Sequence, residues 1–234
     1  MLTNKTINKL QNEQEKLDEF IRQKKNLTDA DSRESFIRTK IALLVEIGEL
    51  ANELKTFKHW KSQKEVNWEK AKEELIDCLH FYLSWANSFQ IDFSDYKFRK
   101  LAPEPGYNEL LLTLFSETES FSLTAPFNIV KQNALANIKK SWEEYLTKNE
   151  SEEKLAKEKE EVAKIVEEQE KKFEKINIDF IGAIKEVKNK ENFYCWLIIF
   201  EELAQKLGMR SEKDIEEAYM AKNKINWQRQ QKNY

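Results

Sequence analysis

The chain of 234 residues contains little glycine, proline or cysteine: four, three and two residues, respectively. Sheets joined by hairpins need turn residues at short intervals, so this scarcity disfavours a β architecture and favours long helices with few connections. Cys78 and Cys195 both lie in apolar helical stretches, and we expect two reduced core thiols instead of a disulfide. The composition predicts an all-α protein.

The chain also lacks an excess of charge of one sign and any long hydrophobic run. Lysine and arginine total 39, aspartate and glutamate 42, for a net charge of −3. This interspersed balance contains no basic stripe of the kind that nucleic-acid binding requires. The longest purely apolar run, Tyr194 to Phe200, is far shorter than the ~20 residues that span a bilayer, and the N-terminus has no apolar signal-peptide core. We expect a cytoplasmic protein that binds neither nucleic acid nor membrane.

The positive evidence is helical periodicity of the apolar residues. It predicts helices over 5–25, 34–57, 67–89, 108–120, 128–146, 150–175, 192–207 and 212–234. The strongest break is at Pro103, Pro105 and Gly106. We expect a single all-α domain over 1–234, with a metal-binding half at about 1–100. The second helical half, about 107–234, contains a Lys/Glu-rich helix and a basic C-terminal tail. For that helix, a solvated amphipathic helix is favoured over a short coiled-coil arm.

Four carboxylates stand out in the first half. Glu46 and Glu49 form an E-x-x-E pair, and Glu74 and Asp77 form an E-x-x-D pair on the next predicted helix. Positions i and i+3 share a helix face, so each pair directs two acids to one place. Any one glutamate is most simply a solvated salt-bridge partner, but these four have apolar neighbours and are expected to point inward. Because buried acids are costly to keep charged alone, the set predicts a hard cation, Mg²⁺ with Mn²⁺ as the alternative.

Hydrolysis of a phosphate compound fits such a site. A carboxylate-bound metal neutralises polyphosphate charge and activates water, and a nearby carboxylate can act as general base. The competing di-iron chemistry needs two Glu-x-x-His motifs on different helices. The chain offers a single D-x-x-H, at Asp77 and His80. The sequence therefore favours metal-dependent hydrolysis.

Further side chains suit a nucleotide. Trp60 lies in a basic loop between the two acidic helices and could stack on a base. His80 can border the same pocket, although a structural hydrogen bond is an equal alternative. Near the C-terminus, Lys222, Asn226 and Arg229 share a helical spacing that suits phosphate oxygens, and a frayed polar tail is the alternative.

Two runs of sequence carry a family resemblance: V-E-I-G-E-L-A-N-E-L-K-T-F-K-H-W-K and N-W-E-K-A-K-E-E-L-I-D-C-L-H-F. They resemble the dimeric all-α dUTP pyrophosphatases (dUTPases), which belong to the MazG-type pyrophosphatase group. The resemblance covers about residues 10–90 and returns at the tail, K-N-K-I-N-W-Q-R-Q. It implies an antiparallel helical bundle with a metal site between two acidic helices, and a homodimer.

The resemblance also implies a reaction: water attacks the α-phosphorus of dUTP, with dUDP as a further substrate, to give dUMP and pyrophosphate from dUTP. By the resemblance, Mg²⁺ is held by Glu46, Glu49, Glu74 and Asp77, and Glu49, or next Glu46, orients the attacking water. It also implies that Trp60 and His80 flank the uracil, that Phe81 packs under the deoxyribose, and that Gln14 and Asp18 form hydrogen bonds to the base. Finally, it implies that Lys222, Asn226 and Arg229 close over the phosphates.

Two residues depart from the family pattern. Asp18 occupies a position where many members have asparagine, and Asn233 precedes the final tyrosine where glycine is usual. An acid at Asp18 changes the hydrogen bonds offered to the base, which leaves dCTP or a broader set of deoxynucleotides as an alternative substrate. The alternative from a different class is a non-enzymatic helical interaction protein, which would need no divalent metal.

Overall fold

The computed structural model describes residues 1–27, 33–62, 65–121, 164, 167 and 180–232, with the backbone alone over 180–189. By contacts the chain divides into two compact units, 1–124 with 187–234, and 125–186. The first unit contains every predicted site residue. The helices expected over 128–146 and 150–175 fall almost wholly outside the described residues, and the single domain stays a prediction.

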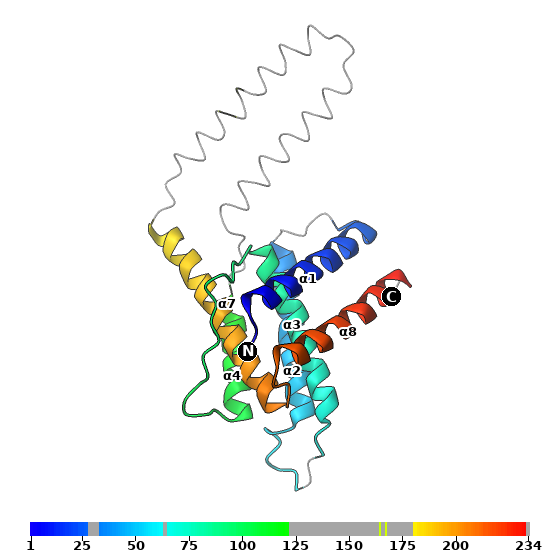
Figure 1. The fold of residues 1–234 in the computed structure, drawn as a ribbon, viewed down its shortest axis with the longest axis vertical. Helices are drawn as coiled ribbons and strands as arrows, with labels where there is room; N and C mark the ends of the chain where they lie inside the picture. The colour runs from blue at the N-terminus through cyan, green and yellow to red at the C-terminus, as the bar shows by residue number, and fades with distance from the viewer. Residues whose placement is uncertain (28–32, 63–64, 122–163, 165–166, 168–179, 233–234) are drawn as a thin grey trace. The chain divides into compact units, whose positions relative to one another are not determined.

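All regular secondary structure in the described residues is helical (Figure 1). The helices are α1 (Asn4–Lys24), α2 (Arg33–Leu54), α3 (Trp68–Ser88), α4 (Tyr107–Ser120), α7 (Phe180–Lys206) and α8 (Glu212–Gln231). Five of them agree with the predicted ranges to within three residues at each end. Helix α7 begins at Phe180, well before the predicted residue 192, and the apolar spacing of Phe180, Ile184 and Val187 was overlooked. The all-α prediction is confirmed. None of the helices in the described ranges is long and apolar enough to cross a bilayer.

Gly208, with φ of 90°, follows α7, but the ends of α1, α2 and α3 use other residues because glycine is scarce. Asn26, Lys55 and Gln90 follow α1, α2 and α3 with φ of 51°, 56° and 50°. These are left-handed conformations that cost an L-residue ~1–2 kcal/mol, so tertiary packing must compensate for them. The N-terminus of α8 is closed by a capping box in which Ser211 accepts from the Asp214 N–H and the Asp214 carboxylate accepts from the Ser211 N–H.

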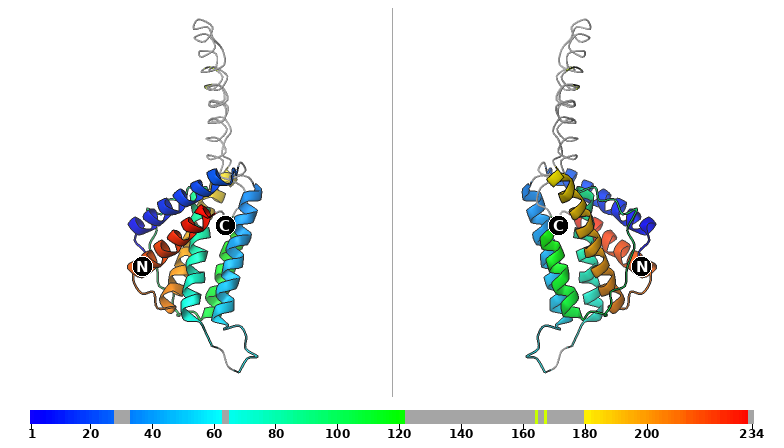
Figure 2. Two further views of the ribbon diagram at one scale, coloured as in Figure 1. Left: turned by 90° about the vertical axis from the view of Figure 1, so that its right-hand side faces the viewer. Right: turned by 90° about the vertical axis from the view of Figure 1, so that its left-hand side faces the viewer.

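Helix α3 is the centre of the first unit. It runs antiparallel to α2, and the loop that connects them reverses the chain direction (Figure 2). α1 and α8 also pack on α3, while α4 packs on α2. On the α7 side, Tyr82 stacks on Trp196 with ring centroids 4.1 Å apart and donates its hydroxyl to the carbonyl of Phe193. The antiparallel helical bundle is thus confirmed, and other helices pack on α3 from several sides.

The two cysteines differ in environment. Cys78 is buried in α3, as expected, and Cys195 on α7 is exposed; both are free. The core prediction was wrong for Cys195 because the buried stripe of α7 is formed by Phe193, Trp196 and Phe200, which leaves Cys195 on the opposite face.

Candidate metal centre and nucleotide pocket

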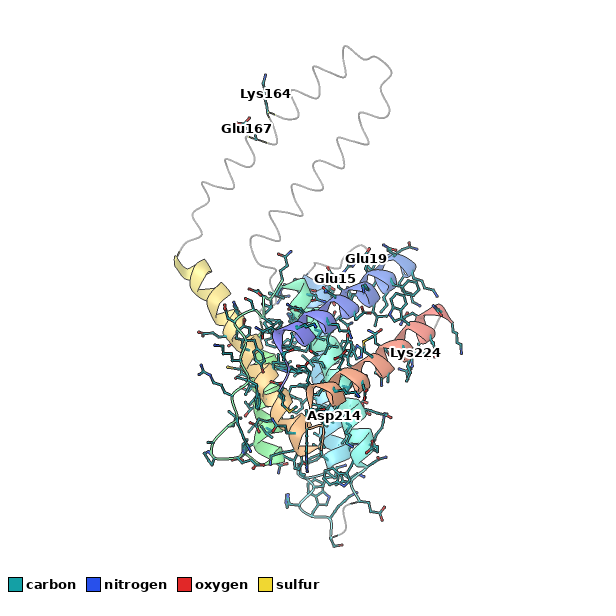
Figure 3. The ribbon with its side chains drawn as sticks, in the orientation of Figure 1. Glu15, Glu19, Lys164, Glu167, Asp214 and Lys224 are labelled. Atoms are coloured by element: carbon teal, nitrogen blue, oxygen red, sulfur yellow. The ribbon has the colours of Figure 1, made fainter. Side chains whose placement is uncertain are left out.

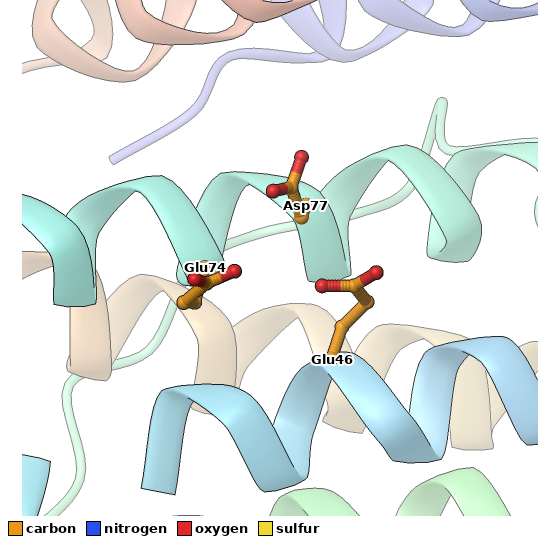
Figure 4. Close-up of side chains that lie close together, drawn as sticks. All are labelled: Glu46, Glu74 and Asp77. Carbon is orange, nitrogen blue, oxygen red and sulfur yellow. The ribbon is translucent and has the colours of Figure 1, made fainter. Parts of the chain in front are cut away.

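Three of the four predicted metal ligands come together between α2 and α3. Glu46 from α2 and Glu74 and Asp77 from α3 each offer a carboxylate oxygen, and these oxygens lie within 4.8 Å of one another (Figure 4). Glu74 is buried, while Glu46 and Asp77 are partly exposed. The i, i+3 spacing on α3 and the antiparallel contact with α2 together produce this group, which we call the carboxylate trio.

The trio is electrostatically strained in the absence of a cation. Burial raises the pKa of Glu46 from its usual 4.5 to about 7, and the neighbouring charges of Asp77, Glu49 and Glu74 contribute in the same direction. Burial also raises the pKa of Asp77. Three converging carboxylate oxygens, with burial opposing the ionisation of Glu46 and Asp77, are the donor set that a hard divalent cation stabilises. The residues therefore fit Mg²⁺ or Mn²⁺.

The fourth predicted ligand, Glu49, lies one turn further along α2. Its side chain is exposed and it is outside the trio, although its charge contributes to the raised pKa of Glu46. The apolar neighbours that suggested an inward direction are themselves divided: Ile47 and Leu50 are buried, whereas Val45 is half exposed. The role of Glu49 in metal binding stays a prediction.

Two lysines contact the trio. Lys70 Nζ lies 2.8 Å from Glu74 and 3.1 Å from Glu73, and these hydrogen bonds raise the pKa of Lys70. Lys222 Nζ, from α8, lies 2.5 Å from Asp77 Oδ2. Sequence reasoning missed Lys70, although its i, i+4 spacing to Glu74 is a visible signal. The contact between Lys222 and Asp77 joins positions far apart in the chain and has no local signal.

A buried polar network lies further along α3, where α1 and α8 pack on this helix. The side-chain oxygen of Gln14 lies 2.8 Å from His80 Nδ1 and accepts a 2.7 Å hydrogen bond from the Tyr219 hydroxyl. The Gln14 amide group donates to Asp18 Oδ1 over 2.8 Å. His80 stacks on Tyr219 with ring centroids 4.1 Å apart. Because an amide oxygen only accepts, His80 carries its proton on Nδ1.

The charge states in this network follow from its burial. Burial, reinforced by the positive charge of Lys222, lowers the pKa of His80 to about 3, so His80 is neutral near pH 7. Burial raises the pKa of Asp18 to about 6, against the opposing effect of hydrogen bonds from Gln14 and Ser84. Asp18 therefore changes from a hydrogen-bond donor to a pure acceptor as the pH rises past about 6.

The remaining predicted substrate residues are more exposed. Trp60 is 65% exposed, and its ring contacts are with Phe57 and His59 in the α2–α3 loop, so the structure does not bring it against His80. Phe81 is partly exposed. On α8, Asn226 is partly exposed and Arg229 is exposed. Gln14, Asp18, His80 and Lys222 are thus gathered near the trio, whereas Trp60 stands apart.

Two α8 residues of this region were not predicted. Tyr219 and Asn223 are buried and follow Ile215 at i+4 and i+8, which is the stripe that packs α8 on the bundle. The signal was present as an apolar and aromatic period of four ahead of the basic tail. It was obscured because Asn223 is polar and counted with that tail.

The fold and the site define a class: an all-helical protein with three clustered carboxylates on an antiparallel helix pair, beside a buried polar network. A family model described as dUTPase matches residues 6–234, and the chain belongs to this family. This confirms the resemblance to the dimeric all-α dUTPases and implies a nucleotide pyrophosphohydrolase that takes a divalent metal. No curated protein and no solved structure matches the chain.

Proposed function

We propose that the protein hydrolyses dUTP, and dUDP as a further substrate, with Mg²⁺ as the preferred cation. The observation that carries this proposal is the carboxylate trio, whose oxygens lie within 4.8 Å of one another in a chain of the dUTPase family. Mg²⁺ bound there would neutralise charge on the polyphosphate and lower the pKa of a bound water. The homodimer and the cytoplasmic location expected from the sequence remain part of this proposal.

The chain's own residues would divide the remaining work. Glu46, Glu74 and Asp77 would hold the metal, while the exposed carboxylate of Glu49 would take a proton from the attacking water. The water oxygen bonds to the α-phosphorus, the bond from that phosphorus to the bridging oxygen breaks, and pyrophosphate leaves. Lys222, Asn226 and Arg229 bind the phosphates.

The pocket residues would select the nucleoside. Gln14 and Asp18 offer the base an amide and a carboxyl group whose positions are fixed by their mutual hydrogen bond. His80, neutral and backed by Tyr219, forms one wall. Phe81 and Trp60 complete the sugar and base contacts, and for Trp60 this requires the α2–α3 loop to approach the pocket.

The test is pyrophosphate release from dUTP, dCTP, dTTP and UTP, each with Mg²⁺ and with EDTA. We expect release from dUTP that depends on Mg²⁺ and far exceeds that from the other three. Comparable release from dTTP and UTP would overturn the proposed pocket while leaving the metal chemistry intact. No metal-dependent release from any of the four would overturn the proposed function.

A second candidate substrate is dCTP, or a broader set of deoxynucleotides, and Asp18 is the observation that favours it. Above a pH of about 6 the carboxylate of Asp18 can only accept hydrogen bonds. Cytosine offers an amino group where uracil offers a carbonyl oxygen. An ionised Asp18 facing that edge would favour cytosine, whereas a protonated one would favour uracil.

Replacing Asp18 with asparagine tests this directly. The amide of Asp18→Asn donates at every pH, so the ratio of kcat/KM for dUTP to that for dCTP should rise about tenfold at pH 8, the value of one mismatched hydrogen bond. In the wild type the same ratio should fall as the pH rises through about 6, and in the variant it should stay flat. Glu15→Gln, on the exposed face of α1, is the matched control and should leave the ratio at pH 8 unchanged, because Asp18 is ionised there in both proteins (Figure 3). A ratio that is unaffected by Asp18→Asn would show that Asp18 does not face the base.

A further inference from the structure

One contact in the site has no place in the proposed catalytic cycle. Lys222, expected on the phosphates, instead lies with its ammonium 2.5 Å from Asp77 Oδ2. The two side chains are only 16% and 15% exposed, so this is a largely buried ion pair between α8 and α3. It uses a carboxylate of the trio.

The ion pair offsets charge repulsion within the trio. Three acids whose oxygens lie within 4.8 Å repel one another, and the ammonium of Lys222 is one of the positive charges that offset this repulsion. Lys70 provides a second, on Glu74. In the absence of a metal, the lysines therefore stand in for part of the cation charge.

The same ammonium would oppose a divalent cation. A positive charge on Asp77 lies within a few ångströms of any cation that the trio holds, and both would use the same carboxylate charge. Lys222 can leave without disturbing α8, because the helix is fastened elsewhere: Lys24 donates to the carbonyls of Gln230 and Gln231, and Trp227 packs on Phe20 with ring centroids 4.6 Å apart. The flexible lysine stem allows the ammonium alone to move.

The position of Lys222 on α8 would let its released ammonium reach the phosphates of a bound nucleotide. Lys222 shares a helix face with Asn226, one turn on. Its charge also acts on His80 in the polar network. Lys222 thus lies between the trio and the nucleoside pocket, where the phosphates of a bound nucleotide would pass.

We propose that Lys222 is an internal counter-ion of the metal site: it neutralises Asp77 in the metal-free protein, competes with the divalent cation for the trio, and is transferred to the nucleotide phosphates when metal and substrate are bound. This rests on the proposed metal site. It predicts that the nucleotide-free protein binds metal less tightly than the trio would without Lys222. It also predicts that bound nucleotide restores the metal affinity, because its phosphates take the Lys222 ammonium away from Asp77.

The test is Mn²⁺ binding to the full chain without nucleotide, measured by titration calorimetry. Lys222→Met keeps the length of the stem and removes the charge, and it should bind Mn²⁺ at least about tenfold more tightly than the wild type, as expected for removing a unit charge at this range. Lys222→Arg keeps the charge and should stay within about threefold of the wild type. Lys224→Met removes a charge from an exposed position two residues along α8 and should also stay within about threefold (Figure 3).

Thermal unfolding supplies the second measurement. In EDTA, Lys222→Met should melt below the wild type because Asp77 loses its counter-ion, and Mn²⁺ should raise its Tm by more than it raises that of the wild type. Should the methionine variant not fold, Lys222→Gln, which is uncharged but can donate to Asp77, replaces it. Equal or weaker Mn²⁺ binding by the uncharged variant would overturn the counter-ion role. Failure of the wild type and the variant alike to bind Mn²⁺ would instead overturn the proposed metal site.

Discussion

Glu49→Gln should lower kcat for dUTP hydrolysis by about 10²- to 10⁴-fold, the usual contribution of a general base. The structure motivates separate roles within one helix turn. Glu46 is in the carboxylate trio, whereas the exposed side chain of Glu49 lies outside it and is available to a water molecule. Glutamine has nearly the same size but cannot take a proton. We therefore expect Mn²⁺ affinity to remain within about threefold of the wild type, since Glu49 lies outside the carboxylate trio.

The division of roles is tested by measuring both quantities on the same protein. Glu53→Gln is the matched control, because it changes the same residue type one turn further along α2, and its kcat should be close to that of the wild type. A parallel loss of kcat and Mn²⁺ affinity in Glu49→Gln would make Glu49 a fourth metal ligand. A kcat unchanged by the substitution would remove Glu49 from the mechanism.

The extent to which the sequence could predict this site depends on the range of the interactions. Glu74 and Asp77 share a helix turn, so their common face follows from the helical period alone. Their pairing with Glu46 follows from a short connection between two strongly periodic helices, which makes an antiparallel pair the simplest packing. These parts were predictable because each depends on local spacing.

The outward position of Glu49 was harder to foresee. Its neighbours in sequence are mostly apolar, but the helical period places Ile47 and Leu50 on the buried face and leaves Val45 and Glu49 exposed. Apolar neighbours along the chain do not define a helix face, whereas residues three and four positions away do. The expectation that all four acids point inward came from their adjacent residues in the sequence and not from the residues that share their helix face.

The contributions of α8 depend on tertiary packing. Lys222 contacts Asp77, and Tyr219 contacts Gln14 and His80, through the docking of α8 on α3 and α1. No spacing rule connects residues on helices so distant in the chain. Only the family resemblance linked the tail to the site, and it assigned Lys222 to the phosphates, not to a carboxylate.

Glu46→Gln should have opposite effects on stability and on metal binding. The folded-state pKa of Glu46 is about 7 against a usual 4.5, so the folded protein binds more protons than the unfolded chain between these values and its stability falls as the pH rises through that window. Glutamine does not ionise, so Glu46→Gln removes this pH-dependent loss of stability. After a discount for the partial exposure of Glu46, we expect the metal-free variant to be more stable than the wild type by about 1 kcal/mol at pH 8 and nearly equal to it at pH 5.

The same substitution should weaken Mn²⁺ binding by at least about 100-fold and abolish most dUTP hydrolysis, because a direct ligand matters at least as much as the outer-shell groups whose loss costs ~10- to 100-fold. Thermal melts in EDTA at the two pH values and Mn²⁺ titration are the measurements, with Glu53→Gln expected to change neither. Greater stability of the metal-free variant together with lost metal binding would identify the burial of Glu46, and its repulsion by Asp77 and Glu74, as strain maintained for the cation. A variant that is destabilised at pH 8 and still binds Mn²⁺ would show that Glu46 stabilises the helix pair and is not a ligand.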